Sequence, residues 1–336
     1  MRFILGVDGG NSKTHALVMD ESGRVLGFGL GGPGNHQSDG LVPAVKEIRR
    51  AALSALDQAE LPPDSVELGC FCLAGADLPE DYAMLQDAML GQSLARSVIV
   101  KNDTMAALRA GLSCSWGVVV ICGAGTNAAG RSQDGKEIVM PGMGPISGDW
   151  GGGGSLSQEM IRLVMRAWDG RGKPTLLTGL VLGALQAPSV EVLLSRLYHE
   201  EIDQQRLLDL VPLLFEAAEA GDEVAQDLII QAGIEVGITA RTLIRRLGLD
   251  QKDVEVILGG SVFKGKGSLL LDTITRVVNE QAPKARVIRS KYEPVVGAAL
   301  LALEAIGIDV NVSLYHVLES TLPDRLAISR AESSST

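Results

Sequence analysis

A short turn near the start of the chain carries residue types suited to binding phosphate. It reads Asp8-Gly9-Gly10-Asn11-Ser12-Lys13-Thr14. Residues without side chains let a phosphate approach the backbone, and amides that point inward can donate to its oxygens. Asp8, at the end of an apolar run, is a candidate ligand of Mg²⁺, either directly or through water. An ordinary hairpin turn explains the same residues, because Gly-Gly and Gly-Asn pairs are common in hairpins.

Two familiar nucleotide motifs do not match this turn. If Lys13-Thr14 ended a Walker loop, glycines would be needed where Val7 and Ser12 stand. The dinucleotide-binding fingerprint requires a helix after the turn, whereas the sequence predicts a strand from Thr14 onward. Both motifs are therefore excluded.

A second glycine turn, Gly123-Ala124-Gly125-Thr126-Asn127, has the same surroundings as the first. Each turn stands in a run of strand, glycine turn, strand, polar turn and strand. Internal duplication on this scale predicts two related α/β domains that face each other. Two such turns could hold one polyphosphate from both sides, although a second hairpin explains this turn equally well when it is taken alone.

Asp103 is the candidate general base. It follows a short predicted strand and precedes a predicted helix, so its carboxylate lies at the carboxyl edge of a sheet, where open α/β sheets bind ligands. A sugar hydroxyl loses its proton as it attacks the γ-phosphate of ATP, and an oriented aspartate can accept that proton. The structural alternative is an N-cap, since aspartate is common at that position of a helix.

Three further positions have both a functional and a structural explanation. Asn35, after Gly32-Pro33-Gly34, could bond sugar hydroxyls, or it could be a turn asparagine that tolerates positive φ. Asp149 stands among glycines, where a carboxylate can approach a ligand or a metal, or simply close a turn. Gly259-Gly260 could let a purine lie flat on the backbone, or form a strand–helix turn.

Composition and charge exclude several classes of protein. The 336 residues are 46% apolar and 21% charged, with a net charge of -11 and no basic stripe, which argues against nucleic-acid binding. Local amides and a cation must therefore hold any phosphate. No apolar run reaches the roughly 18 residues of a membrane span, and no signal peptide is evident. The four cysteines form no Cys-x-x-Cys pair, so we expect reduced thiols, no zinc site and a cytoplasmic protein.

Hydrophobic periodicity predicts the elements that position these residues. We expect helices at 43–56 and 104–112, a mainly helical stretch at 155–248 that Ser155-x-x-Gln158 opens as a capping box, and a helix after Pro294. We expect a disordered tail at 331–336. The predicted strands are residues 2–8, 14–20, 25–30, 66–73, 98–101, 117–122, 128–131, 136–140, 254–258 and 286–289.

In their order along the chain, these motifs resemble the BadF/BadG/BcrA/BcrD ATPase family of the ASKHA superfamily, and within it the N-acetylglucosamine kinases. The resemblance covers nearly the whole chain. The segments that carry it are residues 6–14, 32–35, 102–103 and 123–127, the glycine loop Gly142-Met143-Gly144 with Gly148-Asp149, and residues 258–262.

The resemblance implies an α/β fold of two actin-like (ribonuclease H-like) domains, each a mixed five-stranded sheet with helices, around an ATP cleft. We expect domains at 1–112 and 113–310, a C-terminal helix that packs back within 311–336, MgATP as cofactor, and a homodimer. Asp103 would be the base and Asp8 the metal ligand. The implied phosphate and nucleotide contacts are Gly9 to Thr14, Gly123, Ala124, Gly125, Thr126, Gly259, Gly260 and Ser261. The implied sugar contacts are Asn35, Ala74, Gly75, Asp103, Asn127, Gly142, Met143, Gly144 and Asp149.

We therefore expect a kinase that phosphorylates an amino sugar or hexose, with N-acetylglucosamine and its 6-phosphate as the first choice. The family usually has threonine where Ala124 stands, tryptophan where Met143 stands, and an acidic residue with Gly-Ser where Trp150-Gly151-Gly152 stands. These differences surround the acceptor more than the nucleotide. Two alternatives are an ATPase that activates a partner protein through an iron–sulfur cluster, and a sugar-binding member without catalysis, for which Ala124 is the main argument.

Overall fold

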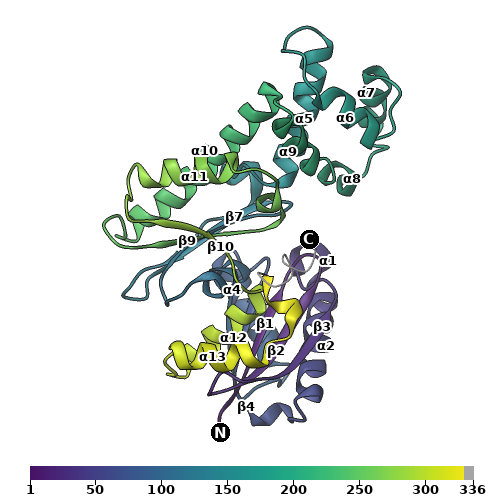
Figure 1. Ribbon diagram of the computed structural model, residues 1–336. Coiled ribbons are helices and arrows are strands. Elements are labelled where there is room, and N and C mark those ends of the chain that lie inside the picture. The colour runs from purple at the N-terminus through teal and green to yellow at the C-terminus, as the bar shows by residue number, and fades with distance from the viewer. Residues whose placement is uncertain (329–336) are drawn as a thin grey trace. The chain divides into compact units, whose positions relative to one another are not determined.

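The computed structural model describes residues 1–328 (Figure 1), so the predicted tail at 331–336 lies outside the described residues. It contains two five-stranded sheets, with strand orders β3-β2-β1-β4-β5 and β10-β9-β6-β7-β8. Read from the other edge, the second order becomes β8-β7-β6-β9-β10, which repeats the first. The expected fold class, two mixed five-stranded sheets with helices, is confirmed.

The strands are Phe3–Gly9 (β1), Thr14–Asp20 (β2), Val25–Gly31 (β3), Val66–Leu73 (β4), Ser97–Asn102 (β5), Gly117–Cys122 (β6), Thr126–Arg131 (β7), Glu137–Val139 (β8), Glu255–Gly259 (β9) and Arg286–Arg289 (β10). The α-helices are His36–Asp39 (α1), Leu41–Gln58 (α2), Pro79–Leu90 (α3), Asp103–Gly111 (α4), Gly153–Trp168 (α5), Leu177–Ala184 (α6), Val190–Tyr198 (α7), Gln204–Leu208 (α8), Val211–Glu219 (α9), Glu223–Arg246 (α10), Leu269–Asn279 (α11), Pro294–Ala305 (α12) and Val312–Thr321 (α13). Short 3₁₀ helices span Pro63–Ser65 (η1), Gly144–Ser147 (η2), Ser261–Lys264 (η3) and Asp324–Leu326 (η4).

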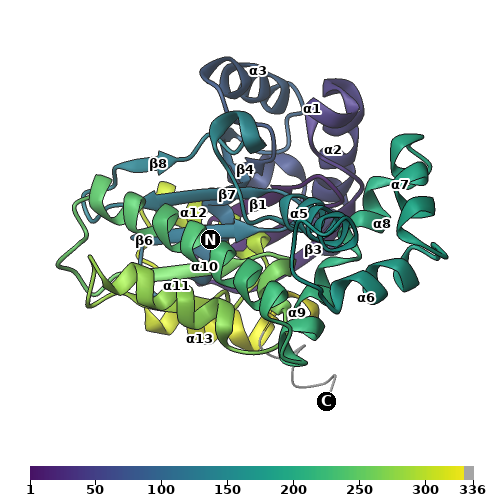
Figure 2. The same cartoon turned by 90° about the horizontal axis from the view of Figure 1, so that it is seen from above.

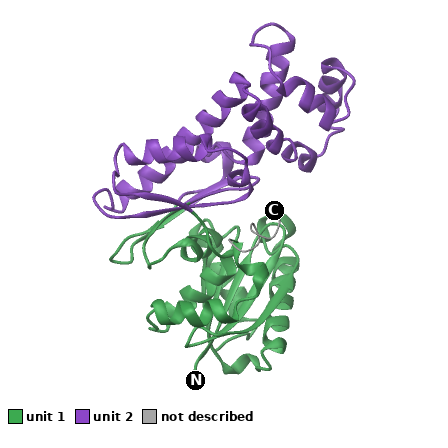
Figure 3. Ribbon diagram, in the orientation of Figure 1, with its two compact units in different colours: residues 1–119, 129–139, 289–336 green, residues 120–128, 140–288 purple. Residues whose placement is uncertain are grey.

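The chain divides into two compact units, shown in Figure 3. The first comprises Met1–Val119, Ala129–Val139 and Arg289–Thr336. The second comprises Val120–Ala128 and Met140–Ile288. The sequence therefore passes between the units several times.

The first unit is built on the sheet of β1 to β5. β1 runs antiparallel to β2 and parallel to β4, and β4 runs parallel to β5. Alternate residues of β1, Leu5 and Val7, join a buried core with Ile48 and Ala52 of α2, because successive strand residues point to opposite faces. The loops that follow β1, β4 and β5 leave the sheet at the carboxyl ends of parallel strands, the edge at which α/β proteins bind ligands.

Glycines let α12 pack tightly in the first unit. A Cβ built on Gly6 of β1 would lie 2.3 Å from the Ala299 nitrogen, and one on Gly297 would lie 1.9 Å from the Ala106 oxygen of α4. Neither site has room for a side chain, so α12 lies directly against both β1 and α4. This packing fixes the position of α4, the helix that begins at Asp103.

The second unit carries most of the helices. Helices α10 and α11 pack side by side (Figure 2), and a Cβ on Gly233 or Gly237 of α10 would lie 2.7 Å from Thr273 or Val277 of α11. Helices α5 to α9 follow one another in the segment between β8 and α10. No helix among residues 1–328 has the length and apolar character needed to cross a bilayer.

The predicted strands are present, with ends that shift by one or two residues. The capping box at Ser155 was wrong: α5 begins at Gly153, and its N-cap is Gly152, which has no side chain to cap with. Contacts with a distant segment explain why the helix begins earlier than predicted. The Gly153 and Gly154 amides donate to the carbonyls of Gly123 and Ala124, at 2.7 and 2.8 Å, so the start of the helix needs no capping side chain.

Candidate active site

In the first unit, backbone hydrogen bonds join three loops. The Gly34 amide donates to the Gly10 carbonyl at 2.9 Å, and the Ala74 amide donates to the Gly9 carbonyl at 2.8 Å. The first glycine turn is thereby bonded to the Asn35 loop and to the loop after β4. The structure thus brings Ala74 to the first turn, while a Cβ on Gly75 would lie 2.5 Å from Asn35 Oδ1.

The first glycine turn presents free backbone donors. Its Gly10 amide is used internally, since it donates to the Lys13 carbonyl at 3.0 Å. Within residues 1–328 the amides of Asn11, Ser12 and Lys13 have no such partner. Unpaired amides at a tight turn attract anions, so this turn can accept phosphate oxygens.

Asn35 has a structural role that the sequence did not predict. Its φ is -91°, so the explanation that it tolerates positive φ was wrong; it is the N-cap of α1, and its Oδ1 accepts from the Gln37 amide at 2.8 Å. Its Nδ2 donates to Asn11 Oδ1 at 2.6 Å. Each polar atom of a side-chain amide can make a second hydrogen bond. Asn35 can therefore still contact a sugar hydroxyl while it holds the loop in place.

Asp103 is not the cap of its helix. Asn102 is the N-cap of α4, and its Oδ1 accepts from the Thr104 amide at 3.0 Å. The N-cap explanation of Asp103 was therefore wrong, and no side chain among residues 1–328 pairs with its carboxylate. Burial, and then the negative charge of Asp77, raise the pKa of Asp103 to about 6, while backbone amides at the helix start oppose the shift. An aspartate with that pKa is ionised at neutral pH and retains proton affinity.

Asp8 ends β1 within the same unit. Its pKa is raised to about 8 by burial, and then by the charges of Asp103 and Glu293, while Lys13 acts in the opposite direction. Lys13 Nζ lies 3.4 Å from Glu293 Oε2. Glu293 precedes Pro294 at the start of α12, and no sequence signal marked it, because only the fold brings it back to the first turn. The oxygen donors and the excess negative charge are those that a divalent cation requires.

A direct cage of protein ligands is absent from the described residues, where no group of three histidine, cysteine or acidic side chains has metal-binding geometry. Mg²⁺ commonly binds to one or two carboxylates together with phosphate oxygens and water. The surroundings of Asp8 fit that type of site.

In the second unit, the second glycine turn is bonded to the start of α5. Besides the contacts of Gly153 and Gly154, the Gly123 amide donates to the Gly125 carbonyl at 3.0 Å. Within the described part of the chain the amides of Ala124 and Gly125 have no partner. A Cβ on Gly123 or Gly125 would meet nothing within 4 Å, and neither has positive φ. The fold therefore does not require glycine at these two positions, whereas a phosphate pressed against the backbone does.

The second glycine loop lies against the second turn. A Cβ on Gly142 would come within 2.7 Å of Asn127 Cγ, so these two residues are in contact. Asp149 Oδ2 accepts from the Gly144 amide at 3.0 Å and from Ser147 Oγ at 2.5 Å. Asp149 thus closes the loop that contains Met143, whose side chain is exposed. The structure brings together Asn127, Gly142, Gly144 and Asp149, as expected.

Gly259 and Gly260 differ in whether the fold leaves room for a side chain. Gly260 has φ of +103°, and a Cβ there would lie 2.3 Å from the Cys122 oxygen, so the fold itself requires glycine. Gly259 makes only an ordinary contact, to Ile121 at 3.7 Å. The structural explanation therefore holds for Gly260, and Gly259 is the one that leaves room for a ligand.

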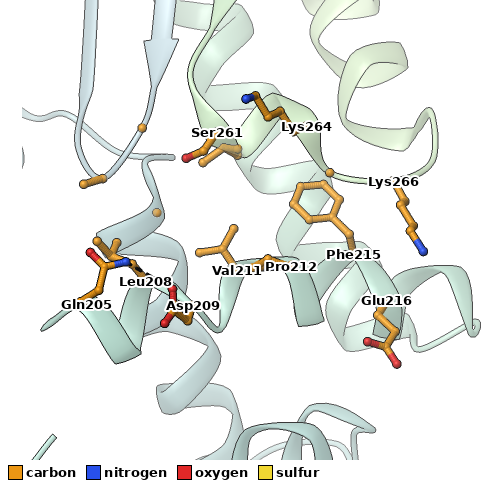
Figure 4. A pocket seen from close by; sticks show the side chains of 15 residues that line it. Gln205, Leu208, Asp209, Val211, Pro212, Phe215, Glu216, Ser261, Lys264 and Lys266 are labelled. Atoms are coloured by element: carbon orange, nitrogen blue, oxygen red, sulfur yellow. Dashed lines mark hydrogen bonds between the residues drawn. The ribbon is translucent and has the colours of Figure 1, made fainter. Parts of the chain in front are cut away.

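A pocket of about 600 Å³ opens beside Gly123, Ala124 and Ser261 in the second unit. Figure 4 shows side chains of α8 and α9 on one side of it and Ser261 and Lys264 of η3 on the other. Sequence reasoning missed the residues that supply its walls, because α8 and α9 carry no motif and reach the turn only through the tertiary fold. These residues are Gln205, Leu208, Asp209, Val211, Pro212, Phe215, Glu216, Lys264, Gly265 and Lys266.

This pocket has the character of a small-molecule site. Such sites have volumes of roughly 300–1,000 Å³, mostly apolar walls and a few polar groups. Phe215 packs on the backbone of the opposite loop, since a Cβ on Gly265 would lie 2.5 Å from its ring. The aromatic ring of Phe215 and the free amides of the second turn thus line the same pocket.

The cysteines are free thiols, as expected. Cys70 and Cys72 are buried in β4, with sulfur atoms 3.8 Å apart. The hydrogen bond to Cys70 and burial raise the pKa of Cys72 well above its usual range. The Cys72 thiol is therefore held in its protonated form.

Two relatives match most of the chain. It is 27% identical over 302 residues to the N-acetylmuramic acid/N-acetylglucosamine kinase of Clostridium acetobutylicum, which covers 90% of this chain and 98% of that protein. It is 30% identical over 314 residues to the N-acetyl-D-glucosamine kinase of Dictyostelium discoideum, with the same coverage.

Solved structures share the fold at lower identity. A provisionally named N-acetylglucosamine kinase from Chromobacterium violaceum superposes with a TM-score of 0.66 at 22% identity, over 90% of this chain and 99% of that one. A ROK family glucokinase from Streptomyces griseus, solved with glucose and AMPPNP, superposes with a TM-score of 0.56 at 21% identity and the same coverage. The model of the BadF/BadG/BcrA/BcrD ATPase family matches residues 5–302. The chain belongs to the BadF/BadG/BcrA/BcrD ATPase family.

Proposed function

We propose that this chain is a sugar kinase that transfers the γ-phosphate of ATP to an amino sugar or hexose, with the 6-hydroxyl of N-acetylglucosamine as the preferred acceptor. The names of both relatives support an N-acetylated amino sugar. The family and the fold support ATP as the donor.

The observation that carries this proposal is the unpaired carboxylate of Asp103. Asn102 takes the capping role, so the carboxylate of Asp103 meets only backbone amides at the start of α4 and has no side-chain partner among residues 1–328. Keeping such a group partly buried among other acids costs stability, as its raised pKa indicates. An acceptor hydroxyl would give this carboxylate a partner and a proton to accept.

The other residues have separate roles in this proposal. Asn35 orients the sugar through its free hydrogen-bond capacity, and the loop of Ala74 and Gly75 forms the floor beside it. The free amides of the two glycine turns bind phosphate oxygens as charge moves onto them in transfer. The pocket beside Phe215 holds the adenosine. Asn127, Gly142, Met143, Gly144 and Asp149 contribute further contacts to the acceptor.

Asp8 would hold Mg²⁺, with Lys13 and Glu293 setting the local charge. When bound, the ion neutralises the charge of the phosphate oxygens. In this unit the charge of Asp103 raises the pKa of Asp8, and a cation near Asp8 would favour its ionised form. We further propose a cytoplasmic homodimer, which light scattering on purified protein would test.

Asp103→Ala provides the direct test, with ATP consumption measured against N-acetylglucosamine, glucosamine, glucose, N-acetylmannosamine and no acceptor. We expect turnover to fall by about 10²-fold or more while nucleotide still binds. Asp87→Asn, an exposed change on α3, is the matched control and should retain turnover.

Three results would contradict the proposal. Full turnover by Asp103→Ala would refute the assignment of Asp103 as the general base. Equal ATP hydrolysis with and without sugar would favour the ATPase alternative. Sugar binding by calorimetry without any phosphorylated product would favour a catalytically inactive member of the fold.

A further inference from the structure

Asp77 joins the loop of Asn35 to the turn that carries Asp103. It lies in the loop between β4 and α3, within the first unit. The Asn102 Nδ2 donates to Asp77 Oδ1 at 2.9 Å, and the Gln37 Nε2 donates to Asp77 Oδ2 at 3.2 Å. Each carboxylate oxygen therefore holds a different segment of the candidate acceptor site.

The two donors are themselves fixed. The Gln37 side chain also donates to the Gly75 carbonyl at 3.3 Å, and its backbone amide donates to Asn35 Oδ1. Asn102 donates in addition to the Ala76 carbonyl at 3.1 Å, and its Oδ1 caps α4. Hydrogen bonds thus form a continuous bridge from Asn35, the proposed sugar contact, through Gln37 and Asp77 to Asn102, which precedes the proposed base.

We propose that Asp77 is a positioning residue for phosphoryl transfer: its carboxylate fixes the Asn102–Asp103 turn relative to the acceptor loop and places a second negative charge behind the base. This inference rests on the proposed role of Asp103. A base needs an oriented partner, because a shift of about 1 Å in a reacting group can cost roughly 10²-fold in rate.

Amide donors suit this role because they cannot titrate. The pKa of Asp77 is raised by burial, and the hydrogen bonds from Gln37 and Asn102 oppose that rise. Asp81 of α3 adds repulsion, and His36 of α1 acts in the opposite direction. The bridge therefore keeps a negative charge where burial alone would favour a proton.

That charge acts on the base. Among the groups that face Asp103, Asp77 is the largest charge contribution to its raised pKa, after burial, and Asp8 faces it from the end of β1. An aspartate with a higher pKa accepts a proton more readily in the transition state. Asp77 thus combines two effects, position and proton affinity, which different substitutions can separate.

The test compares Asp77→Asn with Gln37→Ala, using kcat and kcat/KM for N-acetylglucosamine at saturating MgATP from pH 5 to pH 9. Asp77→Asn keeps the shape, removes the charge and replaces one of the two accepting oxygens by a donor. The acidic limb of the pH–rate profile should therefore move to lower pH, and kcat should fall. Gln37→Ala keeps the charge of Asp77 and removes two hydrogen bonds, to Asp77 and to the Gly75 carbonyl, so kcat should fall by about 10-fold to 10²-fold with the limb unmoved. In neither variant should the KM for ATP change.

Asp87→Asn is the control, because Asp87 is an exposed acid of α3 whose side chain bonds neither Asp77 nor its two amide donors among residues 1–328. Its acidic limb should coincide with that of the wild type. The inference is overturned if the Asp77→Asn profile superimposes on the wild type, or if Asp87→Asn moves the limb equally. Asp103→Ala, measured in the same assay, separates the two proposals. If it is inactive and the Asp77 result is still negative, only the role of Asp77 is refuted. If Asp103→Ala is active, the proposed function itself is refuted.

Discussion

Asp8→Asn should make the folded protein more stable and at the same time inactive. The carboxyl of Asp8 carries the largest raised pKa among the proposed site residues, about 8 against an ordinary value of 3.8. Burial is the main cause, followed by repulsion from Asp103 and Glu293. Asparagine has nearly the same shape but no charge, so the repulsion disappears, together with the ability to bind a cation strongly.

The magnitude follows from linkage. A folded pKa above the unfolded one means that ionisation favours the unfolded chain; the penalty is absent below about pH 4, grows with rising pH and is complete above about pH 8. At pH 7 this penalty has an upper limit of about 4 kcal/mol, because pH 7 lies about 3 pH units above the ordinary pKa and each corresponds to roughly 1.36 kcal/mol. Because Asp8 is only partly buried, solvent screens part of this, and we expect about 1–2 kcal/mol.

Thermal unfolding without metal or nucleotide, followed by circular dichroism at pH 5, 7 and 8, measures this effect. The melting temperature of Asp8→Asn should exceed that of the wild type by roughly 2–6 °C at pH 7, with a larger difference at pH 8 and a small one at pH 5. Asp57→Asn, an exposed change on α2, should show no such trend. A difference that does not grow with pH would refute the electrostatic reasoning. Undiminished kcat in Asp8→Asn would refute the metal role.

Three other changes test separate parts of the structure. Gly10→Val should fold, since only one backbone oxygen lies near a Cβ there, at 3.4 Å, yet calorimetry should show at least about tenfold weaker binding of an ATP analogue. Phe215→Ala should raise the KM for ATP by about tenfold with kcat unchanged, whereas Phe215→Leu should stay near the wild type; a change confined to kcat would contradict the pocket assignment. Glu304→Gln should cost about 3 kcal/mol in chemical denaturation, because it leaves Arg109, whose side chain is 3% exposed, without its 2.7 Å partner. The exposed control Glu223→Gln should cost less than about 0.5 kcal/mol, and equal losses would contradict this reasoning.

Local patterns predicted much of the fold. The apolar runs that became β1, β2, β4 and β6 are short, strongly apolar and bounded by glycine or polar turns, so period and length alone identify them. The duplication of strand and glycine turn predicted two related α/β domains, and the two sheets do repeat one strand order. Sequence was less reliable at helix starts, where partners from distant segments can replace a capping side chain, as at α5.

Two of the structural alternatives that the sequence left open were decided by single contacts, one made by a side chain and one by the backbone. Whether Asn102 or Asp103 capped α4 could not be read from adjacent residues of similar capping preference. Likewise, both glycines after β9 look equivalent in the sequence, but only Gly260 meets the Cys122 carbonyl. Such distinctions depend on φ and on neighbours far along the chain.

The sequence by itself determined the two glycine turns, the candidate base and the family, because these depend on residue types at fixed local spacing. Only the tertiary structure identified Asp77, Glu293 and the pocket residue Phe215. Each of these residues contacts segments of its own unit that lie far away in the sequence, and no local pattern encodes such contacts. The glycine turn at Asp8 provides the amides, and the fold decides which charges and hydrogen bonds act on the groups around it.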